Sequence, residues 1–542
     1  MSTAIAPTRG EAGLPPLDAR TGLRVAGAAL LAATLFWSPL LLGGALAGGD
    51  WATHHFHYFD WVRVSLTQHA TLPLYMADAW VTPNFLGNAE APTLGPLAWL
   101  LVLLPTGVYL KLLIVVFTAA GLAGCWLLLR DLGVAPSVAA LGSIAFAWSG
   151  FFFSHVTVGH HWAMGAWSLP LLFWLFRRGA LGNTGLLVAA ALLNAFTIMG
   201  GQHQPFIWQN LALGAFALLW AVRTRAAFPL SGLATVWLLS AGLGAVKLLP
   251  VWLEFRDYAP TARIVGFPLG SLLPALAASG RVREFVDPAI SYEWGAGWWE
   301  YAFYLGPLAL VALAAGCVAR LRAGWPLLAV GALFLVLSVE TLGVWPLLEG
   351  LPLLRSQRCP SRFLLLAVFS LCIAGSVGLE GLRTAASARW PRAALAGAWL
   401  LVAAVGLDLW RESLPWQRAG VGEAIERRDH HPWPEVRKSG AVLVELTDFA
   451  PNHLTYRVEA KRPLTATLPV RFGKGGSTSD WKLEGGAARA QGDLLAVAVS
   501  EGVSELRIAY RPPGLRAGAA ISAATVLGIL GGWRRVRRKA VS

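Results

Sequence analysis

Residues 111–148 read KLLIVVFTAAGLAGCWLLLRDLGVAPSVAALGSIAFAW, two long apolar runs joined by a short turn that contains Arg130. A helix that crosses a bilayer needs about 20 apolar residues. The first run extends over 106–129 and the second over 137–154. This stretch therefore predicts two membrane-spanning helices, with the basic turn at one membrane surface.

The whole chain has the composition of a membrane protein. Of its 542 residues, 56% are hydrophobic and only 14% are charged, and its mean hydropathy is +0.56. Soluble domains contain about 25% charged residues. The 26 tryptophans fit the same class, because Trp favours the membrane–water interface. The net charge of +14 comes from short basic clusters between apolar runs, which indicates a lipid bilayer and no nucleic acid.

The same length criterion predicts about twelve membrane-spanning helices. The apolar runs fall near 25–47, 106–129, 137–154, 162–176, 184–200, 206–222, 230–249, 301–319, 324–342, 363–381, 393–409 and 516–533. Basic residues follow every second run, namely Arg130, Arg177 and Arg178, Arg223 and Arg225, Arg320 and Arg322, Arg383, Arg389 and Arg392, and finally RRVRRK (534–539). By the positive-inside rule, this alternation predicts that both termini lie in the cytoplasm.

The fold class predicted is an all-α polytopic membrane protein with a small extracytoplasmic β-sandwich near the C-terminus. We expect a disordered cytoplasmic tail at 1–22, and a transmembrane domain at 23–409 with outer loops 48–105, 250–300 and 343–362. Residues 410–515 contain short β-type runs, such as HLTYRVEA, between turn residues, which predicts the outer β-rich domain. The last membrane helix and a basic cytoplasmic tail then occupy 516–542.

The first outer loop begins GGDWATHHFHYFD (48–60), which allows three interpretations. A metal site would use His54, His55 and His57 with a carboxylate, although residues 54 and 55 point to different faces of a regular element and no metal motif completes the set. The stretch is also compatible with a solvated interfacial loop. Alternatively, Asp50 is a general base, because a carboxylate beside low-dielectric surface has a raised proton affinity.

A second polar stretch, RSQRCPSR (355–362), precedes the tenth apolar run. Arg355, Arg358 and Arg362 are spaced to share one helical face. Guanidinium groups suit phosphate binding, and ordinary interfacial arginines are the alternative. Three arginines on the outer side run against the positive-inside bias, which favours a phosphate of a lipid as the ligand.

Further polar residues fall on the same predicted side of the membrane. They are Glu90, His160, Gln204 and Glu300. Ionisable residues near membrane depth are costly and usually functional. A single outward-facing cavity could therefore collect them.

Several blocks of the chain resemble the bacterial YfhO-like membrane proteins, which belong to the GT-C class of glycosyltransferases. The blocks are GDWATHHFHYFDWVRVSLTQHATLPLY (49–75), GNAEAPTLGP (87–96), GGQHQP (200–205), WWEYAFYLG (298–306), RCPSRF (358–363) and the tail from DWKLEGG (480–486) to 528. Single blocks are weak, but their order over about 480 residues is specific.

The resemblance implies roles for individual residues. GT-C enzymes place a catalytic carboxylate in the first outer loop, where Asp50 stands and Asp60 does not match. Arg358 and Arg362 match two signature arginines, for which the resemblance suggests the phosphate of the donor. Glu90 and Gln204 match positions that would contact sugar or acceptor. His160 matches a histidine of no assigned role, and His54 and His55 depart from the family, which leaves substrate choice open.

The resemblance thus implies an inverting glycosyltransferase that moves a sugar from a polyprenyl-phosphate (undecaprenyl) donor to a glycan, lipid or protein acceptor of the cell envelope, on the extracytoplasmic face. His54, His55 and Glu300 are expected in the substrate cavity. The sequence indicates no cofactor. The loop is compatible with a divalent metal ion, but no motif points to one. A transporter or flippase of lipid-linked sugars and a non-catalytic envelope-assembly protein are the alternatives.

Overall fold

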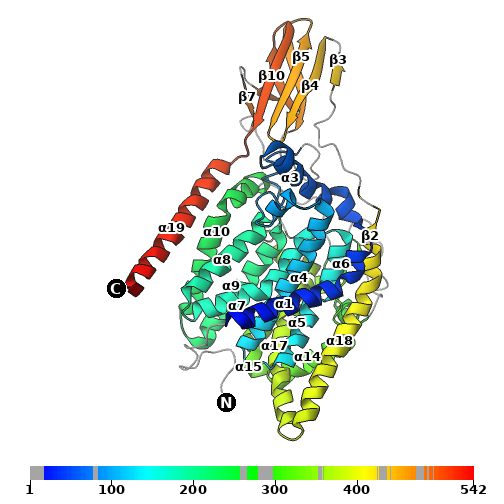
Figure 1. Ribbon diagram of the computed structural model, residues 1–542, viewed down its shortest axis with the longest axis vertical. Helices are drawn as coiled ribbons and strands as arrows, with labels where there is room; N and C mark the ends of the chain where they lie inside the picture. Colours follow the sequence, from blue (N-terminus) through cyan, green and yellow to red (C-terminus); the bar gives the residue numbers. More distant parts are fainter. Residues whose placement is uncertain are drawn as a thin grey trace.

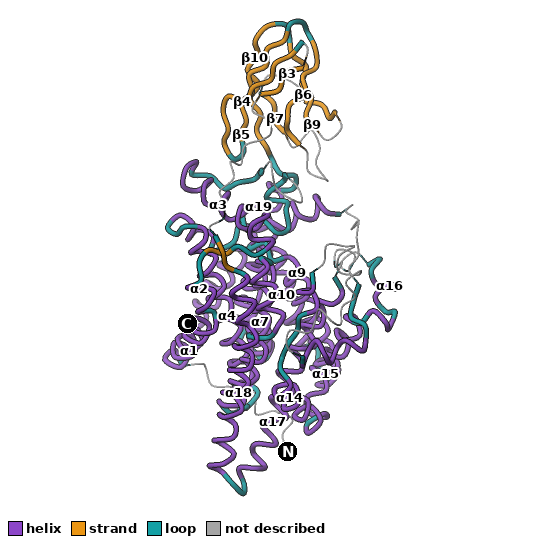
Figure 2. Tube along the Cα trace, turned by 90° about the vertical axis from the view of Figure 1, so that its right-hand side faces the viewer, coloured by secondary structure: helices purple, strands orange, loops and turns teal. Residues whose placement is uncertain are grey.

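The computed structural model describes residues 18–76, 83–256, 265–278, 297–351, 354, 357, 359–423, 425, 436–439, 441–471, 481–484, 488–491 and 494–541. Arg355, Arg358 and most of the predicted tail at 1–22 lie outside this part of the chain. Helices form one large body, and strands form a smaller one at its end (Figures 1 and 2).

The chain is mostly helical. Its α-helices are α1 (Ala19–Phe36), α2 (Ser38–Leu42), α3 (Phe56–His69), α4 (Thr106–Asp131), α5 (Pro136–Ala147), α6 (Gly150–Val158), α7 (Leu169–Ala180), α8 (Thr184–Met199), α9 (His203–Thr224), α10 (Phe228–Phe255), α11 (Leu272–Ala277), α14 (Pro307–Ala319), α15 (Leu321–Ser338), α16 (Trp345–Leu348), α17 (Leu364–Ser387), α18 (Pro391–Ala419) and α19 (Leu515–Val541). Short 3-10 helices include η3 (Ala98–Val102), η4 (His161–Ser168), η6 (Trp298–Tyr301) and η8 (Pro360–Phe363).

Seven helical stretches among the described residues are long and apolar enough to cross a membrane. They are Thr106–Asp131, Pro136–Val158, His203–Thr224, Phe228–Phe255, Pro360–Ser387, Pro391–Ala419 and Leu515–Arg534. Three shorter apolar helices are Thr184–Met199, Pro307–Ala319 and Gly324–Ser338. These helices mark a membrane protein, as predicted, while the number twelve stays a prediction. The first apolar run is split at Trp37, because Pro39 disfavours a continuous helix before it.

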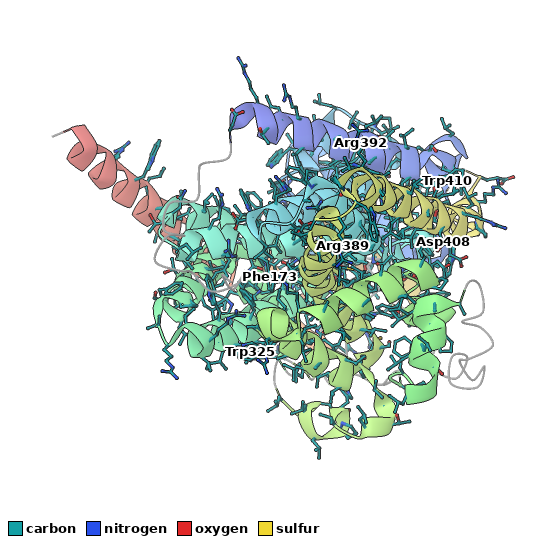
Figure 3. The ribbon with its side chains drawn as sticks, turned by 90° about the horizontal axis from the view of Figure 1, so that it is seen from below. Phe173, Trp325, Arg389, Arg392, Asp408 and Trp410 are labelled. Atoms are coloured by element: carbon teal, nitrogen blue, oxygen red, sulfur yellow. The ribbon has the colours of Figure 1, made fainter. Side chains whose placement is uncertain are left out.

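Small residues let the helices pack closely. A Cβ atom at Gly378 of α17 would lie 1.8 Å from the carbonyl oxygen of Gly316 in α14, so the two backbones are in direct contact. Such contacts are typical of membrane helices. Phe173 of α7 lies near the middle of the bundle (Figure 3), where its ring is 5.3 Å from that of Phe216 and 5.0 Å from that of Phe369.

The turn between α17 and α18 lies at the end of the molecule opposite the strands (Figure 1). It carries Arg389 and Arg392, both exposed (Figure 3). These are residues of a basic cluster that the positive-inside pattern assigns to the cytoplasm. The side of the membrane on which this turn lies stays a prediction.

The strands near the C-terminus form two antiparallel sheets. One has the order β3 (Val436–Ser439), β4 (Val442–Ala450), β5 (His453–Ala460), β10 (Gly502–Tyr510) and β7 (Trp481–Leu483). The other has the order β6 (Leu464–Arg471), β9 (Leu494–Val499) and β8 (Ala488–Gln491). Alternate residues of β5 are buried, and they share one apolar core with residues of β6 and β9.

Helices occupy parts of two segments that were expected outside the membrane. The outer segment was expected to begin at 410, but α18 continues to Ala419. The cause is tertiary, because the side-chain amide of Gln417 donates to the Phe36 carbonyl and accepts from the Leu40 N–H, which holds the last turns against α1 and α2. A short strand, β2 (Val421–Gly422), then pairs with β1 (Ala45–Leu46). The predicted outer loop 48–105 also contains a helix, α3.

The β4–β5 turn fastens the strands to the chain that follows α3. The side-chain oxygen of Asn452 accepts from the Leu74 N–H at 2.7 Å, and its amide donates to the Leu72 carbonyl at 2.9 Å. The ring of Phe449 stacks on Trp61 with centroids 5.6 Å apart. The β-rich domain is therefore attached to the helical body by directed contacts as well as by the chain.

We predict that Asn452→Ala destabilises this junction by about 2 kcal/mol, because it leaves a part-buried N–H and a carbonyl without their partner. Thermal unfolding followed by the strand signal in circular dichroism measures the effect. Glu501→Ala, at an exposed residue between β9 and β10, is the control. Equal unfolding midpoints for the two variants would contradict the prediction.

Candidate functional site

Asp50 lies directly before a single π-helical turn, Trp51–His55, that leads into α3. The indole N–H of Trp51 donates to the Val156 carbonyl of α6 at 2.9 Å. Gly159, at the end of α6, has φ +107, and a Cβ atom there would lie 2.2 Å from the Trp51 nitrogen. A glycine is therefore required at this contact, which places Asp50 beside the residues that follow α6.

A chain of close contacts runs inward from Asp50. Its Oδ2 lies 2.9 Å from His160 Nε2, and His160 Nδ1 lies 2.6 Å from His155 Nδ1. His155 Nε2 is 4.0 Å from Oε2 of Glu300. Asp50 has a side chain that is 36% exposed, whereas His155 and Glu300 are buried. The contacts therefore connect an accessible carboxylate to the interior.

The inner end of the chain is a buried ion pair. The guanidinium of Arg362 binds Glu300 through two N–H groups, one of them at 2.6 Å, and a third N–H bonds to the Gln204 side-chain oxygen. The guanidinium carbon also lies 4.3 Å from the centroid of the Trp162 ring, a cation–π contact. Segments η4, η6 and η8 and helix α9 meet at this pair.

Glu90 reaches the same region from a loop that Lys247 holds in place. Lys247 of α10 is buried, and its ammonium donates to the carbonyl groups of Leu86, Asn88 and Ala91 at 2.8, 2.7 and 3.0 Å. The Glu90 carboxylate lies 3.2 Å from Nε2 of His55. A buried amine that binds three carbonyl groups fixes this loop strongly.

The electrostatics of the cluster favour ionised carboxylates. Burial raises the pKa of Asp50, but the hydrogen bond and charge of His160, with His55 and His54, outweigh burial and lower that pKa from 3.8 to about 2. Burial likewise opposes ionisation of Glu90, yet His55 holds the pKa of that carboxyl well below its usual range. Burial lowers the pKa of His54 to about 4. Asp50 is thus an anion at neutral pH, and the expectation that its surroundings raise its proton affinity is wrong.

Two groups of side chains have the composition and spacing of metal ligands. They are Asp50, His54 and His55, and His155, His160 and Glu300, with ligand atoms within 4.8 Å of one another in each group. The expectation that residues 54 and 55 point apart is wrong, since their ring centroids are only 4.2 Å apart. The reason is the π-helical turn, whose wider spacing brings both rings to one side.

Most of the predicted site residues that the structure describes meet in this cluster. They are Asp50, His54, His55, Glu90, His160, Gln204, Glu300 and Arg362. Arg355 and Arg358 lie outside the described residues. Asp60 is elsewhere, buried and accepting a hydrogen bond from Thr106 at 2.7 Å. His155 and Lys247 were missed, although an ionisable residue in or at the end of an apolar run is a signal for function.

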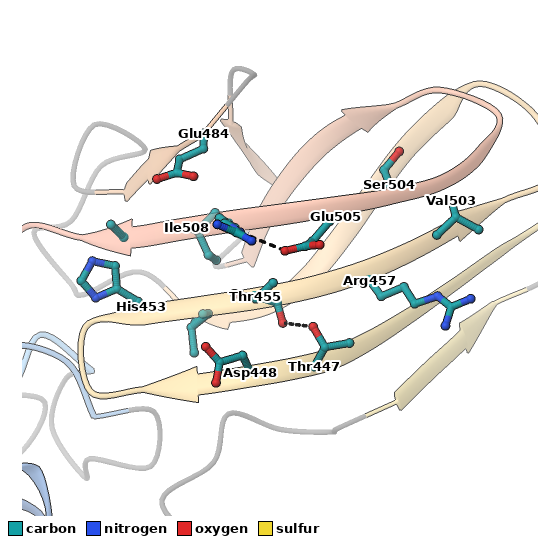
Figure 4. A pocket seen from close by; sticks show the side chains of 13 residues that line it. Thr447, Asp448, His453, Thr455, Arg457, Glu484, Val503, Ser504, Glu505 and Ile508 are labelled. Atoms are coloured by element: carbon teal, nitrogen blue, oxygen red, sulfur yellow. Dashed lines mark hydrogen bonds and ion pairs between the residues drawn. The ribbon is translucent and has the colours of Figure 1, made fainter. Parts of the chain in front are cut away.

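A separate hollow of about 760 Å³ lies on the five-stranded sheet (Figure 4). Polar side chains line it, among them Asp448, His453, Arg457 and Glu505. It lies apart from the cluster around Asp50, which contains most of the predicted site residues and is therefore the better candidate site.

Sequence comparison gives no matching protein family and no matching curated protein. Among solved structures, the chain is similar to one described as the cryo-EM structure of arabinofuranosyltransferase AftD from Mycobacteria, with 18% identity and a TM-score of 0.47. The match covers 74% of this chain and 27% of that one, so this chain spans about a quarter of its length. A likeness at this level carries no argument about activity.

We predict that Lys247→Met releases the loop that bears Glu90. The methionine fills similar space but leaves three carbonyl groups without a donor, at a total cost of about 3 kcal/mol. Hydrogen exchange should become faster for amides in 86–95, and the unfolding midpoint should fall. Lys461→Met, at an exposed lysine, is the control. Unchanged exchange in this loop would contradict the role assigned to Lys247.

We also predict a pH signature for the Glu300–Arg362 pair. Burial raises the pKa of Glu300, but Arg362 and the nearby histidines lower it from 4.5 to about 2. The pair therefore stabilises the fold above pH 4.5, and this stabilisation is lost as pH falls toward 2. Glu300→Gln should be less stable than wild type at pH 7, and the difference should narrow by up to about 3 kcal/mol on acidification.

Thermal unfolding in detergent between pH 7 and pH 3 measures this difference. Glu423→Gln, at an exposed carboxyl, should keep the pH dependence of the wild type. A gap between wild type and Glu300→Gln that stays constant over this range would refute the assigned pairing.

Proposed function

We propose that this protein is an inverting, GT-C-like glycosyltransferase that takes a sugar from a polyprenyl-phosphate donor. The observation that carries the proposal is the row of polar side chains from Asp50 through His160, His155 and Glu300 to Arg362, in which His155 and Glu300 are 4.0 Å apart and the other neighbours are hydrogen-bonded. It connects an accessible, ionised carboxylate to a fixed cation. A base for an acceptor hydroxyl and a positive group for a leaving phosphate are what such a transfer needs.

In the proposed reaction, the acceptor oxygen attacks the anomeric carbon of the donor sugar. The Asp50 carboxylate takes the hydroxyl proton as the new glycosidic bond forms. The bond between the anomeric carbon and the phosphate oxygen breaks, and its electron pair leaves with the polyprenyl phosphate. A single displacement of this kind inverts the anomeric centre, and no nucleotide takes part.

Arg362 would stabilise the leaving phosphate without giving up its partners. An arginine side chain has five N–H donors, and Glu300 and Gln204 use three of them. The other two have no acceptor among the described residues, and we propose that they bind phosphate oxygens. Arg355 and Arg358 are proposed to assist from the preceding segment, and the acceptor is proposed to contact Glu90, Gln204, His54 and His55.

The proposed reaction face is extracytoplasmic, in the plasma membrane of a bacterium with both termini in the cytoplasm. This proposal is supported by the position of the site at the end of the molecule that carries the strands. The segment that carries Asp50 continues into α3, which lies next to the strands and far from the basic α17–α18 turn (Figure 1). A lipid donor would enter from the bilayer, and a glycan, lipid or protein acceptor from outside.

The decisive experiment is Asp50→Asn in the purified chain, reconstituted in lipid. Loss of a general base lowers the rate by roughly 10²–10⁴-fold, so transfer of radiolabelled sugar from a defined polyprenyl-phosphate donor should fall by that factor. Asp60→Asn is the matched control, because it is a buried aspartate of the same segment whose amide oxygen can still accept from Thr106.

Transfer by Asp50→Asn at the wild-type rate would remove Asp50 as the base. If wild-type protein transfers no sugar from any polyprenyl-phosphate donor, while a labelled lipid-linked sugar crosses the bilayer, the chain is a flippase instead. Absence of both activities from the folded protein would leave an assembly role as the explanation.

A further inference from the structure

The two ring nitrogens of His55 have different partners. Nδ1 lies 2.6 Å from the Gly159 carbonyl oxygen, which can only accept a hydrogen bond, so Nδ1 carries a proton. Nε2 faces a carboxylate oxygen of Glu90 at 3.2 Å. A neutral ring would present a lone pair to this anion, and that contact is repulsive. His55 Nε2 and the Glu90 carboxylate thus face one another as two possible ligands of one cation.

Two further ligand groups lie at the same place. Oδ2 of Asp50 and Nε2 of His54 are 3.9 Å apart, and the ligand atoms of Asp50, His54 and His55 all lie within 4.8 Å of one another. Two ligands that bind one zinc ion at about 2.1 Å are separated by about 3.4 Å in tetrahedral geometry and about 4.2 Å when opposite. The spacing of the three groups is thus close to that of ligands on a common ion.

We propose that Asp50, His54 and His55, with Glu90 as a fourth ligand, bind one divalent transition-metal ion, with zinc as the preferred metal. Two carboxylates would balance the charge of the ion. Imidazole nitrogen is a good ligand for zinc and a poor one for magnesium or calcium. The contact of His55 Nδ1 with a backbone carbonyl is the usual support for a metal-bound histidine, and His54 Nδ1 has a similar partner, the Thr53 hydroxyl at 2.8 Å.

The second ligand group, His155, His160 and Glu300, is less suited to a metal. Arg362 already binds both oxygens of Glu300 and supplies a positive charge beside it. The two histidines already share a hydrogen bond of 2.6 Å. A dication at this position would be repelled by Arg362, whereas the first group has carboxylates on two sides.

The catalytic role given to the metal rests on the proposed function, whereas the binding of the metal does not. The Asp50 side chain is 36% exposed and the Glu90 side chain 20% exposed, so the ion would be open on one side. A catalytic zinc site keeps such an open position. There the ion could polarise an acceptor hydroxyl or a donor phosphate oxygen, while the second oxygen of Asp50 takes the proton.

The test measures zinc bound to the purified full-length chain after treatment with a chelator and equilibration with ZnCl₂. We expect one zinc per chain, a rise in the unfolding temperature with zinc, and visible absorbance when Co²⁺ replaces it. His54→Gln and His55→Gln should each weaken zinc binding by about tenfold or more. His69→Gln, at the exposed end of α3, and His155→Gln, in the second group, should keep it.

Two results would overturn the inference. One is a folded wild-type chain that binds no zinc or Co²⁺, which would make His55 an imidazolium paired with Glu90. The other is loss of zinc in His155→Gln with retention in His54→Gln, which would move the ion to the second group. If His55→Gln fails to fold, His54→Gln decides, because its side chain lies nearer the surface at 13% exposure.

The outcome is separable from that of the proposed function, because zinc binding is measured without donor or acceptor. If the chain binds zinc at Asp50 but transfers no sugar, the proposed glycosyltransferase function is wrong and the metal site stands. If zinc-free, chelator-treated protein transfers sugar at the full rate, the ion has no catalytic role, and the glycosyltransferase proposal stands.

Discussion

The ion pair between Glu300 and Arg362 is the interaction on which the site depends. Charges buried among apolar helices are stable only when they are paired and hydrogen-bonded. Arg362 satisfies this condition by binding Glu300 and Gln204 and by lying over Trp162. Because these partners come from η6, α9 and η4, the pair fixes the positions of segments that are far apart in sequence. His155 and His160 then extend the polar contacts from this buried pair out to Asp50.

The backbone makes that extension possible through two local features. Gly159 allows the segment around Trp51 to lie directly against the end of α6, where any other residue would introduce a Cβ atom 2.2 Å from the Trp51 nitrogen. The π-helical turn that follows places His54 and His55 on the same side as Asp50. Lys247 brings in the loop with Glu90 from the opposite direction. Lys247 is a buried charge, which proteins retain mainly at functional sites.

The sequence predicted the membrane class and most helix positions, because hydropathy is a local property. Asp50 could be selected from its place after the first apolar run and from family resemblance. The pairing of Glu300 with Arg362 could not be predicted, since it joins residues 62 apart whose separation in space depends on helix packing. The π-helical turn at His54 and His55 was missed because no residue type specifies it. The continuation of α18 beyond the apolar run 393–409 could not be predicted, because Gln417 is held by α1 and α2 through contacts that local sequence does not reveal.

The charges of the cluster favour a positive charge beside Asp50. Asp50, Glu90 and Glu300 supply three negative charges, and Arg362 supplies one positive charge against Glu300. Asp50 and Glu90 therefore require compensation of their own in a part-buried environment. A proton on His55 would contribute to it, and so would a divalent ion held by His54 and His55. Either arrangement keeps Asp50 ionised. The two arrangements differ in one respect. A divalent ion can also bind a substrate oxygen, whereas a protonated His55 that is already paired with Glu90 cannot.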